Sequence, residues 1–487
     1  MATVANVVLG SGYAYGSRSG ASGIEGYPLY EVLPQVQQAT TQPLFGAYQT
    51  AERIEPYQYE SVIIKGAEMG VLAGSIYEDS LERTHELGHS LVANGTTANV
   101  AWMVTDSIDY ESRYKAGKAG FESASVMQGE DPIFVRTITI RGFDASDDTV
   151  DREALLNDIC TGAPVPLDEA TSDKVLFHIG LLSVAKEVYA DIKKYIDWAS
   201  PRHKIVLNGH SVGGSLSILL LLLMTSELGV DYVQKRILRV FAHGSPPVAA
   251  MVDPVTASGM DPNICPIMDA FDLPSDLVYG FVQPYDPVVR LFSDVDALYP
   301  LVDDLGADEV TLYATGPRRS LRPIVRAIFA SWEGWPAFRD NWKGTNQQYQ
   351  SVGTQHLLMP EPLRYLNDRF FSVNVGVPPV EAIVRVSSRE LLPALNDAFP
   401  LDVFQVSLLP QAVRSFLHHF YPAYDTTIAD YAAKITKEKE AEAVMKRKTP
   451  AELENEKQAS NQKLKSVLAE ANGVKNGRRR RYDHDGT

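Results

Sequence analysis

The residues best suited to chemistry lie in the segment KIVLNGHSVGGSLSILLLLL, which begins at Lys204. Ser211 stands between Gly209 and Gly213 in a Gly-x-Ser-x-Gly pattern, with an apolar run on either side. Such a turn between a buried strand and a buried helix is a nucleophile elbow, where glycines leave space around a strained serine. The helix that follows points its positive N-terminal end at this position. We therefore predict that Ser211 is a nucleophile, against the alternative of a serine in an ordinary glycine-rich turn.

A serine hydroxyl attacks poorly unless a base removes its proton and an acid orients that base. After an elbow of this type the acid follows the serine in the chain, and a histidine follows the acid. Asp286 comes after the strand-like VYGFV, on a loop where such an acid is expected, although a turn aspartate before proline fits the same residue. The later histidines in suitable segments are His356, His418 and His419. The residues alone leave the base open among these three.

Strand and helix patterns alternate in the sequence that must position these groups. Apolar alternation and β-branched residues predict strands over 99–107, 133–143, 205–207 and 236–246. Helical periodicity or buried apolar runs predict helices over about 58–93, 181–199 and 214–228. This alternation predicts an α/β fold, with a largely parallel sheet and helices on both of its faces.

Two flanking regions differ from this α/β region in composition. Residues 1–57 are rich in Gly, Ser, Tyr, Pro and Gln, and they predict an irregular N-terminal arm. Residues 431–487 predict a charged tail that is helical or disordered, and from Lys434 onward it carries 14 Lys and Arg against 9 Asp and Glu. The basic cluster Arg478–Arg481 fits a solvated end, and docking to an acidic partner or an anionic membrane surface is the alternative.

Composition argues against several classes of protein. A net charge of −16 disfavours general nucleic-acid binding, which needs positive surface. No run reaches the roughly 18 apolar residues that a membrane span needs. With only Cys160 and Cys265 and no evident secretory signal, we expect an intracellular location, cytoplasmic or organellar, with a plastid as one option. No metal-ligand spacing occurs, so we predict neither a metal nor a cofactor.

Five segments resemble, in the same order, motifs of the class 3 lipase family, the fungal triacylglycerol lipase type of α/β hydrolase. ITIRGFDASDD (138–148) resembles the family's oxyanion strand, and VLFHIGLLSVAKEV resembles its His-x-Gly segment. IVLNGHSVGGSLS is similar to the elbow, VFAHGSPPV to a Phe-Gly-x-Pro-x-Val strand, and YDPVVRL to the acid loop. The resemblance covers about residues 130–292 and implies an α/β-hydrolase fold that cleaves lipid esters.

The resemblance also implies a role for each member of a catalytic triad. Ser211 matches the nucleophile, and Asp286 matches the acid. The family's base often precedes a tyrosine by five residues, and His419 with Tyr424 has this spacing. The neighbouring histidine, His418, is the alternative base. The third candidate, His356, lies in a segment that resembles a strand of the family, which favours a structural role for this histidine.

Two backbone N–H groups should hold the negative oxygen that develops on the substrate. The resemblance implies Val212, which follows the nucleophile, and Phe143, which follows Arg141-Gly142. The family usually has threonine or serine where Phe143 stands, so this chain lacks that hydroxyl. The departure leaves two alternatives, which are slow or absent chemistry and a phenyl ring that shapes the acyl pocket.

The hydrolase domain is predicted over residues 58–430, with two additions. Residues 144–177 occupy the position of the family's lid, with Leu155, Leu156 and Ile159 as an apolar edge, and a surface excursion is the alternative. Residues 293–417 are long for the family and rich in aromatic residues. They are predicted to be an insertion that shapes specificity or a docking surface.

These features predict a serine hydrolase that cleaves carboxylic esters of lipids, either acylglycerols or polar glycerolipids, through an acyl-enzyme. The expected partners are the lipid ester, a peripheral membrane or lipid-droplet surface, and a protein bound by the arm or the tail. The alternative is a catalytically weak or inactive lipase-like protein that acts as a binding module or a structural subunit of a larger assembly. An acyltransferase is a third hypothesis and differs only in the group that accepts the acyl chain.

Overall fold

A computed structural model describes the parts of the chain that carry the predicted chemistry. The described residues, apart from short gaps, are 52–53, 56–78, 81–110, 132–144, 150–199, 203–252, 264–290, 349–360, 380–391, 395, 419 and 421–447. The chain divides into two compact units, residues 1–432 and 433–487, and from the second only helical residues up to 447 are described. Nearly all of the predicted arm, most of the predicted insertion, the end of the tail and His418 lie outside the described residues.

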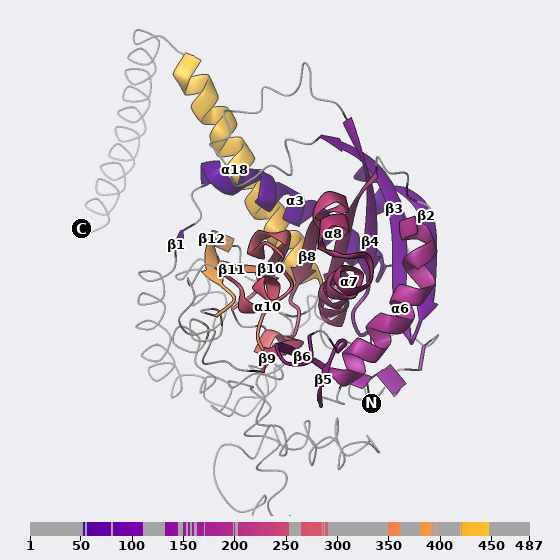
Figure 1. Cartoon of the computed structure of the whole chain (residues 1–487). Coiled ribbons are helices and arrows are strands. Elements are labelled where there is room, and N and C mark those ends of the chain that lie inside the picture. Colours follow the sequence, from indigo (N-terminus) through magenta and orange to yellow (C-terminus); the bar gives the residue numbers. More distant parts are fainter. Residues whose placement is uncertain are drawn as a thin grey trace, which may run out of the picture. The chain divides into compact units, whose positions relative to one another are not determined.

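A nine-stranded sheet runs through the first unit (Figure 1). Its order is β1 (Glu52–Arg53), β12 (Val380–Ser387), β11 (Thr354–Pro360), β10 (Val278–Val282), β8 (Ile237–His243), β7 (His203–His210), β4 (Pro132–Ile140), β3 (Val100–Tyr110) and β2 (Ser90–Thr97). The five inner strands from β11 to β4 are parallel, and antiparallel strands flank them on both sides. This arrangement confirms the predicted α/β fold with a largely parallel sheet.

The strand register brings the predicted chemistry to one edge of the sheet. Ile140 of β4 pairs with Gly209 of β7, and Gly209 pairs with Ala242 of β8. Because the carboxyl ends of parallel strands meet at the same edge, the loops that follow these strands lie together. Ser211 follows β7 and Asp286 follows β10, so both belong to this edge.

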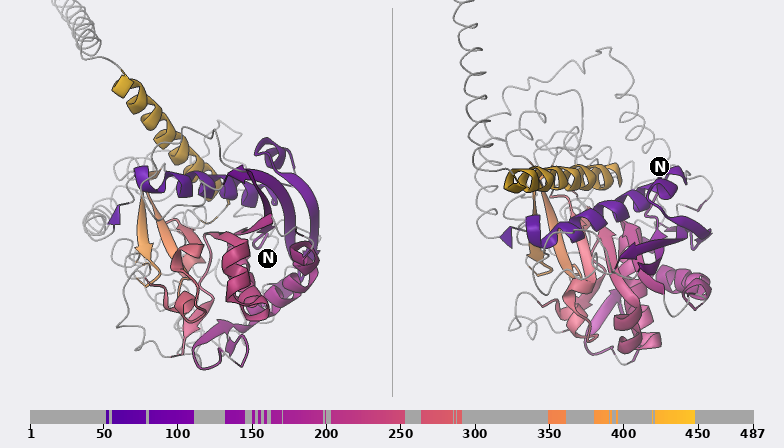
Figure 2. Two further views of the ribbon diagram at one scale, coloured as in Figure 1. Left: turned by 45° about the horizontal axis from the view of Figure 1, so that its top comes forward. Right: turned by 90° about the horizontal axis from the view of Figure 1, so that it is seen from above.

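Helices cover both faces of the sheet (Figure 2). On one face lie α6 (Ile179–Asp197), α7 (Val212–Leu228) and α8 (Val230–Arg236), and α3 (Pro56–Ser75) crosses the other face. Adjacent residues of β7 show the alternation that separates the two faces. Leu207 packs in the core beside α7, whereas the side-chain amide of Asn208 donates to the carbonyl of Met69 in α3 at 2.8 Å.

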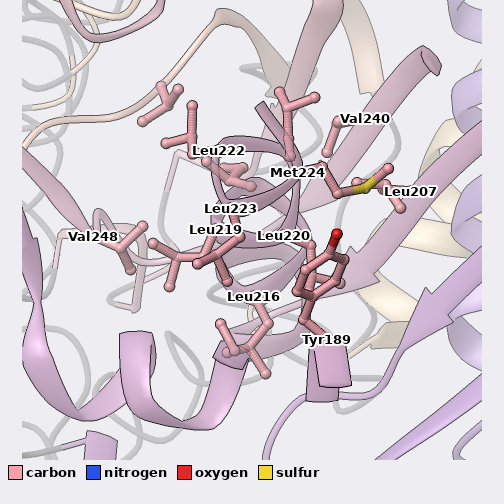
Figure 3. Close-up of a cluster of buried hydrophobic side chains, with 14 of the residues drawn as sticks. Tyr189, Leu207, Leu216, Leu219, Leu220, Leu222, Leu223, Met224, Val240 and Val248 are labelled. Atoms are coloured by element: carbon pink, nitrogen blue, oxygen red, sulfur yellow. The ribbon is translucent and has the colours of Figure 1, made fainter. Parts of the chain in front are cut away.

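Helix α7 is buried on all sides and forms the centre of the main hydrophobic core. Every residue from Val212 to Thr225 is buried, and its leucines lie among side chains of α6, β7 and β8 (Figure 3). A helix that is apolar all round belongs inside a large protein or a membrane. Among the described residues, no helix is long and apolar enough to cross a membrane, so the apolar run after the elbow is explained by burial.

The predicted helix over 58–93 is wrong beyond its first part. The structure has α3, a short helix α4 (Glu82–Glu86), and then β2 from Ser90 onward. A side-chain hydrogen bond from Thr84 to Ser75 at 3.1 Å links α4 back to the end of α3, and Gly88 turns the chain with a φ of 78°. A two-residue turn with φ of 48° and 63° at Ala98 and Asn99 then joins β2 to β3, as expected for a type I′ hairpin.

The region predicted to be a lid, residues 144–177, is partly described and packs against the domain. Leu155 and Ile159 are buried in the main core, and the backbone N–H of Asp151 donates to the side chain of Asn99 at 3.0 Å. Farther on, β5 (Pro164–Pro166) and β6 (Val175–His178) form a small antiparallel sheet with β9 (Ala249–Met251). These two residues of the predicted apolar edge are covered in this conformation, the third, Leu156, lies outside the described residues, and opening of the segment stays a prediction.

Three other boundaries differ from the sequence-based expectation. The last residues of the predicted arm form β1 and the start of α3, and the predicted insertion over 293–417 supplies β11 and β12 of the central sheet. Helix α18 (Tyr421–Arg447) begins before the predicted tail. The remaining short elements are α10 (Pro266–Asp269) and the 3₁₀ turns η2 (Ser275–Leu277) and η3 (Val288–Arg290).

Candidate active site

Ser211 occupies a strained turn between β7 and α7. Its φ of 58° and ψ of −134° lie outside the regions that residues with side chains prefer. The neighbouring glycines are required by space: a Cβ at position 213 would stand 2.1 Å from the carbonyl oxygen of Ile140, and one at position 209 would stand 2.3 Å from the carbonyl of Gly213. The elbow therefore keeps its shape only with Gly209 and Gly213 in place.

The structure brings Ser211, His419 and Asp286 together although 208 residues separate the first two. The Nε2 atom of His419 is 2.7 Å from the Ser211 Oγ. The Nδ1 atom is 3.0 and 2.9 Å from the two carboxylate oxygens of Asp286. With the Nδ1 proton donated to this carboxylate, Nε2 is left to accept the proton of the serine hydroxyl.

Asp286 is fully buried, and hydrogen bonds from several directions fix its carboxylate. The backbone N–H of Val288 donates to Oδ1 at 2.7 Å, and the hydroxyl of Tyr424 donates to Oδ2 at 2.5 Å. Charge-assisted hydrogen bonds of this kind are stronger than neutral ones. The carboxylate is therefore fixed in place and can hold the imidazole in one orientation.

Tyr424 links the acid loop to the first turn of α18. Its hydroxyl accepts from the backbone N–H of Gln283 at 3.1 Å, and the Gln283 side chain donates to the carbonyl of Ala423 at 2.9 Å. Burial and the nearby Asp286 raise the pKa of Tyr424 well above its ordinary value, so the phenol keeps the proton that it donates. Gly244, with a φ of 59°, leaves the space that the tyrosine ring fills, since a Cβ there would be 2.8 Å from it.

The two predicted oxyanion donors belong to adjoining backbone segments. Val212 is the first residue of α7, where an N–H group has no acceptor within its own helix. Phe143 follows Gly142 at the end of β4, and a Cβ on Gly142 would be 2.6 Å from the Cβ of Ser211. The side chain of Phe143 is partly buried against the main core.

The comparison with known families falls on this part of the chain. Residues 138–292 match the family model described as Lipase (class 3). This part of the chain belongs to the class 3 lipase family. The lipase is accordingly an ester hydrolase that acts on lipids. The matched segment contains Ser211 and Asp286, and His419 lies beyond it.

Solved structures that are similar to this chain include fungal lipases. Lipase II from Rhizopus niveus has 11% identity and a TM-score of 0.36, over 70% of this chain and 92% of that chain. The nonglycosylated LIP2 lipase of Yarrowia lipolytica has 13% identity and a TM-score of 0.37, over 69% and 87%. The lipase from Rhizopus microsporus var. chinensis has 13% identity and a TM-score of 0.32, over 50% and 71%. No curated protein matches the sequence, and family membership rests on residues 138–292.

His356 lies within the sheet of the lipase, apart from the serine. It belongs to β11, where its Nδ1 is 3.2 Å from the carbonyl oxygen of Gly280 and its ring stacks on Phe281 at 5.0 Å. Burial lowers the pKa of His356 to about 3, so it stays neutral. This environment fits the structural role that the sequence favoured. Within the described ranges, no group of three or more His, Cys, Asp or Glu residues could hold a metal ion.

Several residues around the site were not predicted from the sequence. Tyr77, Arg83 and Gln283 reach it from the turn after α3, from α4 and from the end of β10. Their partners are 65, 342 and 141 residues away in the chain. No periodicity or local motif connects such pairs, so only the fold shows them.

Gly142→Ala in the lipase is expected to lower kcat at least about 100-fold, because an added Cβ displaces the β4 end from the elbow. Such a Cβ would stand 2.6 Å from the Ser211 Cβ, 2.7 Å from the His210 carbonyl oxygen and 2.7 Å from the Tyr77 hydroxyl. Ester hydrolysis by the purified variant measures the effect. Gly229→Ala is a control for backbone strain alone, since a Cβ there meets nothing within 4 Å but the φ of 86° disfavours a side chain, so this variant should lose stability and keep its turnover. Unchanged turnover in Gly142→Ala would contradict this tight approach.

Arg83→Ala is expected to lower the free energy of unfolding by about 1–3 kcal/mol at pH 8, and by less at pH 5. Arg83 pairs with the buried carboxylate of Asp425 at 2.7 Å, one residue after Tyr424. Burial raises the pKa of Asp425, and Arg83 opposes that rise. A carboxyl group whose pKa is higher in the folded than in the unfolded state makes the fold less stable as pH rises through that pKa. Without the Arg83 guanidinium the pKa of Asp425 is raised further, so more stability is lost at pH 8. Urea unfolding at both pH values measures the difference.

The double variant Arg83→Ala/Asp425→Asn is the control for this linkage. Without a carboxylate at position 425, the decrease in the free energy of unfolding should no longer depend on pH. If Arg83→Ala lowers the free energy of unfolding equally at pH 5 and pH 8, the ion pair does not stabilise the fold through the titration of Asp425.

Proposed function

We propose that the lipase cleaves lipid esters with Ser211 as nucleophile, His419 as base and Asp286 as the acid that orients the base. The observation that carries this proposal is the chain of contacts from Ser211 Oγ to His419 Nε2 at 2.7 Å and from His419 Nδ1 to Asp286 at 2.9 Å. Nucleophile and base within hydrogen-bond reach, with the base oriented by a third group, are the requirement for an activated serine.

The proposed reaction has two halves that use the same groups. Ser211 Oγ attacks the ester carbonyl carbon while His419 takes the hydroxyl proton, and the N–H groups of Val212 and Phe143 hold the negative oxygen. The imidazolium then protonates the departing alcohol, which leaves an acyl group on the serine. Water, deprotonated by His419, attacks the acyl-enzyme and releases the fatty acid. Asp286 orients the imidazole and stabilises the imidazolium that forms in each half.

The proposed substrates are acylglycerols or polar glycerolipids, reached at a peripheral membrane or lipid-droplet surface in an intracellular compartment. The family supports a lipid ester in general, and the finer class is our proposal. No metal or cofactor is required by this chemistry, since the side chains and backbone N–H groups supply every proton transfer and the charge stabilisation.

One observation favours a second candidate function. Phe143 provides a backbone N–H at the oxyanion position but no hydroxyl, and loss of one oxyanion donor costs about 10²–10³ in turnover in other hydrolases. A weak or inactive lipase that binds a partner through its arm or tail is therefore the alternative to the hydrolase.

Hydrolysis of p-nitrophenyl esters from butyrate to palmitate, with and without lipid micelles, tests the proposal. We expect turnover that is lost in Ser211→Ala and that favours long chains once micelles are present. A preference for butyrate that micelles do not change would indicate a general esterase. Folded protein that hydrolyses no ester under either condition would support the binding function.

A further inference from the structure

We propose that Tyr77 is a positioning residue that locks three separate parts of the active site together through His210. The inference rests on the proposed function, because it assigns Tyr77 to the same reaction. Tyr77 lies in the turn after α3, outside the motifs that the sequence suggested for the site. Its hydroxyl sits between the end of β4 and the elbow.

The hydrogen bonds around this hydroxyl have a defined direction. The backbone N–H of Gly142 donates to the Tyr77 oxygen at 2.8 Å, so the tyrosine proton is free to point elsewhere. The Nδ1 atom of His210 is 3.0 Å from the same oxygen and accepts that proton. His210 Nε2 then carries the ring proton and donates to the carbonyl of His419 at 2.6 Å.

Both side chains are held in the protonation state that this arrangement needs. Burial lowers the pKa of His210 well below its ordinary value, and the nearby His419 lowers it further. Burial also raises the pKa of Tyr77, so its phenol stays protonated. A neutral His210 with its proton on Nε2 is the one tautomer that satisfies both of its neighbours.

Each of these hydrogen bonds holds a backbone segment that carries a group of the proposed reaction. Gly142 precedes Phe143, the proposed oxyanion donor, and His210 precedes Ser211, the nucleophile. Through His210 the backbone of His419 is tied directly to the elbow. One hydroxyl thus fixes the oxyanion strand, the nucleophile and the base relative to one another, and small displacements among such groups are costly in rate.

The ring of Tyr77 is itself braced on two sides. It stacks on Tyr421, the first residue of α18, with ring centroids 4.9 Å apart and an interplanar angle of 13°. The guanidinium of Arg141, at the end of β4, lies 5.9 Å from its centroid. Phenylalanine would keep these ring contacts and lose only the hydroxyl, so Tyr77→Phe isolates the hydrogen bonds.

Steady-state hydrolysis of p-nitrophenyl butyrate by wild type, Tyr77→Phe and Tyr279→Phe tests the inference. We expect Tyr77→Phe to lower kcat about 10- to 100-fold with KM within about twofold, because two buried polar groups lose their partner. Tyr279 is buried and its hydroxyl bonds to Arg239 on β8, so Tyr279→Phe should keep the wild-type kcat. Wild-type kcat in a folded Tyr77→Phe would overturn the inference.

A second measurement reports the same network without activity. In ¹⁵N-histidine NMR spectra of the wild type, the signals that disappear in His210→Gln should show a neutral ring protonated at Nε2 from pH 5 to 8. In Tyr77→Phe these signals should shift toward a tautomer mixture. An unchanged His210 tautomer in Tyr77→Phe would overturn the inference, whereas inactivity of the wild type with the predicted spectra would overturn only the proposed function.

Discussion

His419→Ala is expected to lower kcat for a soluble ester by about 10⁵- to 10⁶-fold, the size of effect seen when a triad histidine is removed from a serine hydrolase. The imidazole lies 2.7 Å from Ser211 Oγ, and its removal takes away the base that accepts the hydroxyl proton. The departing alcohol also loses its proton donor, so both halves of the reaction slow. Turnover of p-nitrophenyl butyrate under saturating conditions measures the loss.

His418→Ala is the matched control for this prediction, because both histidines were candidates for the base. Its kcat should remain within about tenfold of the wild type, since the base position is filled by its neighbour. Equal losses in the two variants, or a larger loss in His418→Ala, would reject the assignment of His419.

Asp286→Asn is expected to lower kcat by about 10⁴-fold with the fold intact, as it does in another triad enzyme. An amide can donate to Nδ1 of His419, which forces the ring proton onto Nε2 and leaves no acceptor for the serine hydroxyl. The carboxylate is fully buried and bonded to Tyr424 and Val288, so solvent cannot replace it. Turnover and near-UV circular dichroism of the purified variant measure activity and fold.

Asp276→Asn serves as the control, since this partly exposed aspartate precedes the same strand and pairs only loosely with Arg239 at 3.8 Å. Its kcat should match the wild type. A folded Asp286→Asn that keeps more than about a tenth of wild-type turnover would contradict the role of the acid, because the expected loss is about 10⁴-fold.

The elbow and the acid were predictable because each lies where a local pattern is strongest. The strand before Ser211 and the helix after it are buried, so both appear as apolar runs around a glycine-rich turn. Asp286 follows a strand that is buried along its whole length. The choice of His419 over its neighbours came from the resemblance to the lipase family, since spacing alone left three histidines open.

The rest of the site depends on contacts that no local pattern encodes. The bond from Arg83 to Asp425 spans 342 residues, and the bond from Tyr77 to His210 spans 133. Strand β2 was missed for a different reason. Its residues alternate between exposed and half-buried, so it has no buried apolar face that would distinguish it from the helical pattern before it.

The most direct test of the proposed chemistry is the site at which a fluorophosphonate attaches to the lipase. After reaction with wild type, Ser211→Ala and His419→Ala, mass spectrometry of the proteolytic peptides locates the adduct. We predict one adduct on Ser211, absent in Ser211→Ala and formed far more slowly in His419→Ala. Folded wild-type protein that stays unlabelled with and without lipid micelles, or that carries its adduct on another serine, would contradict the proposal.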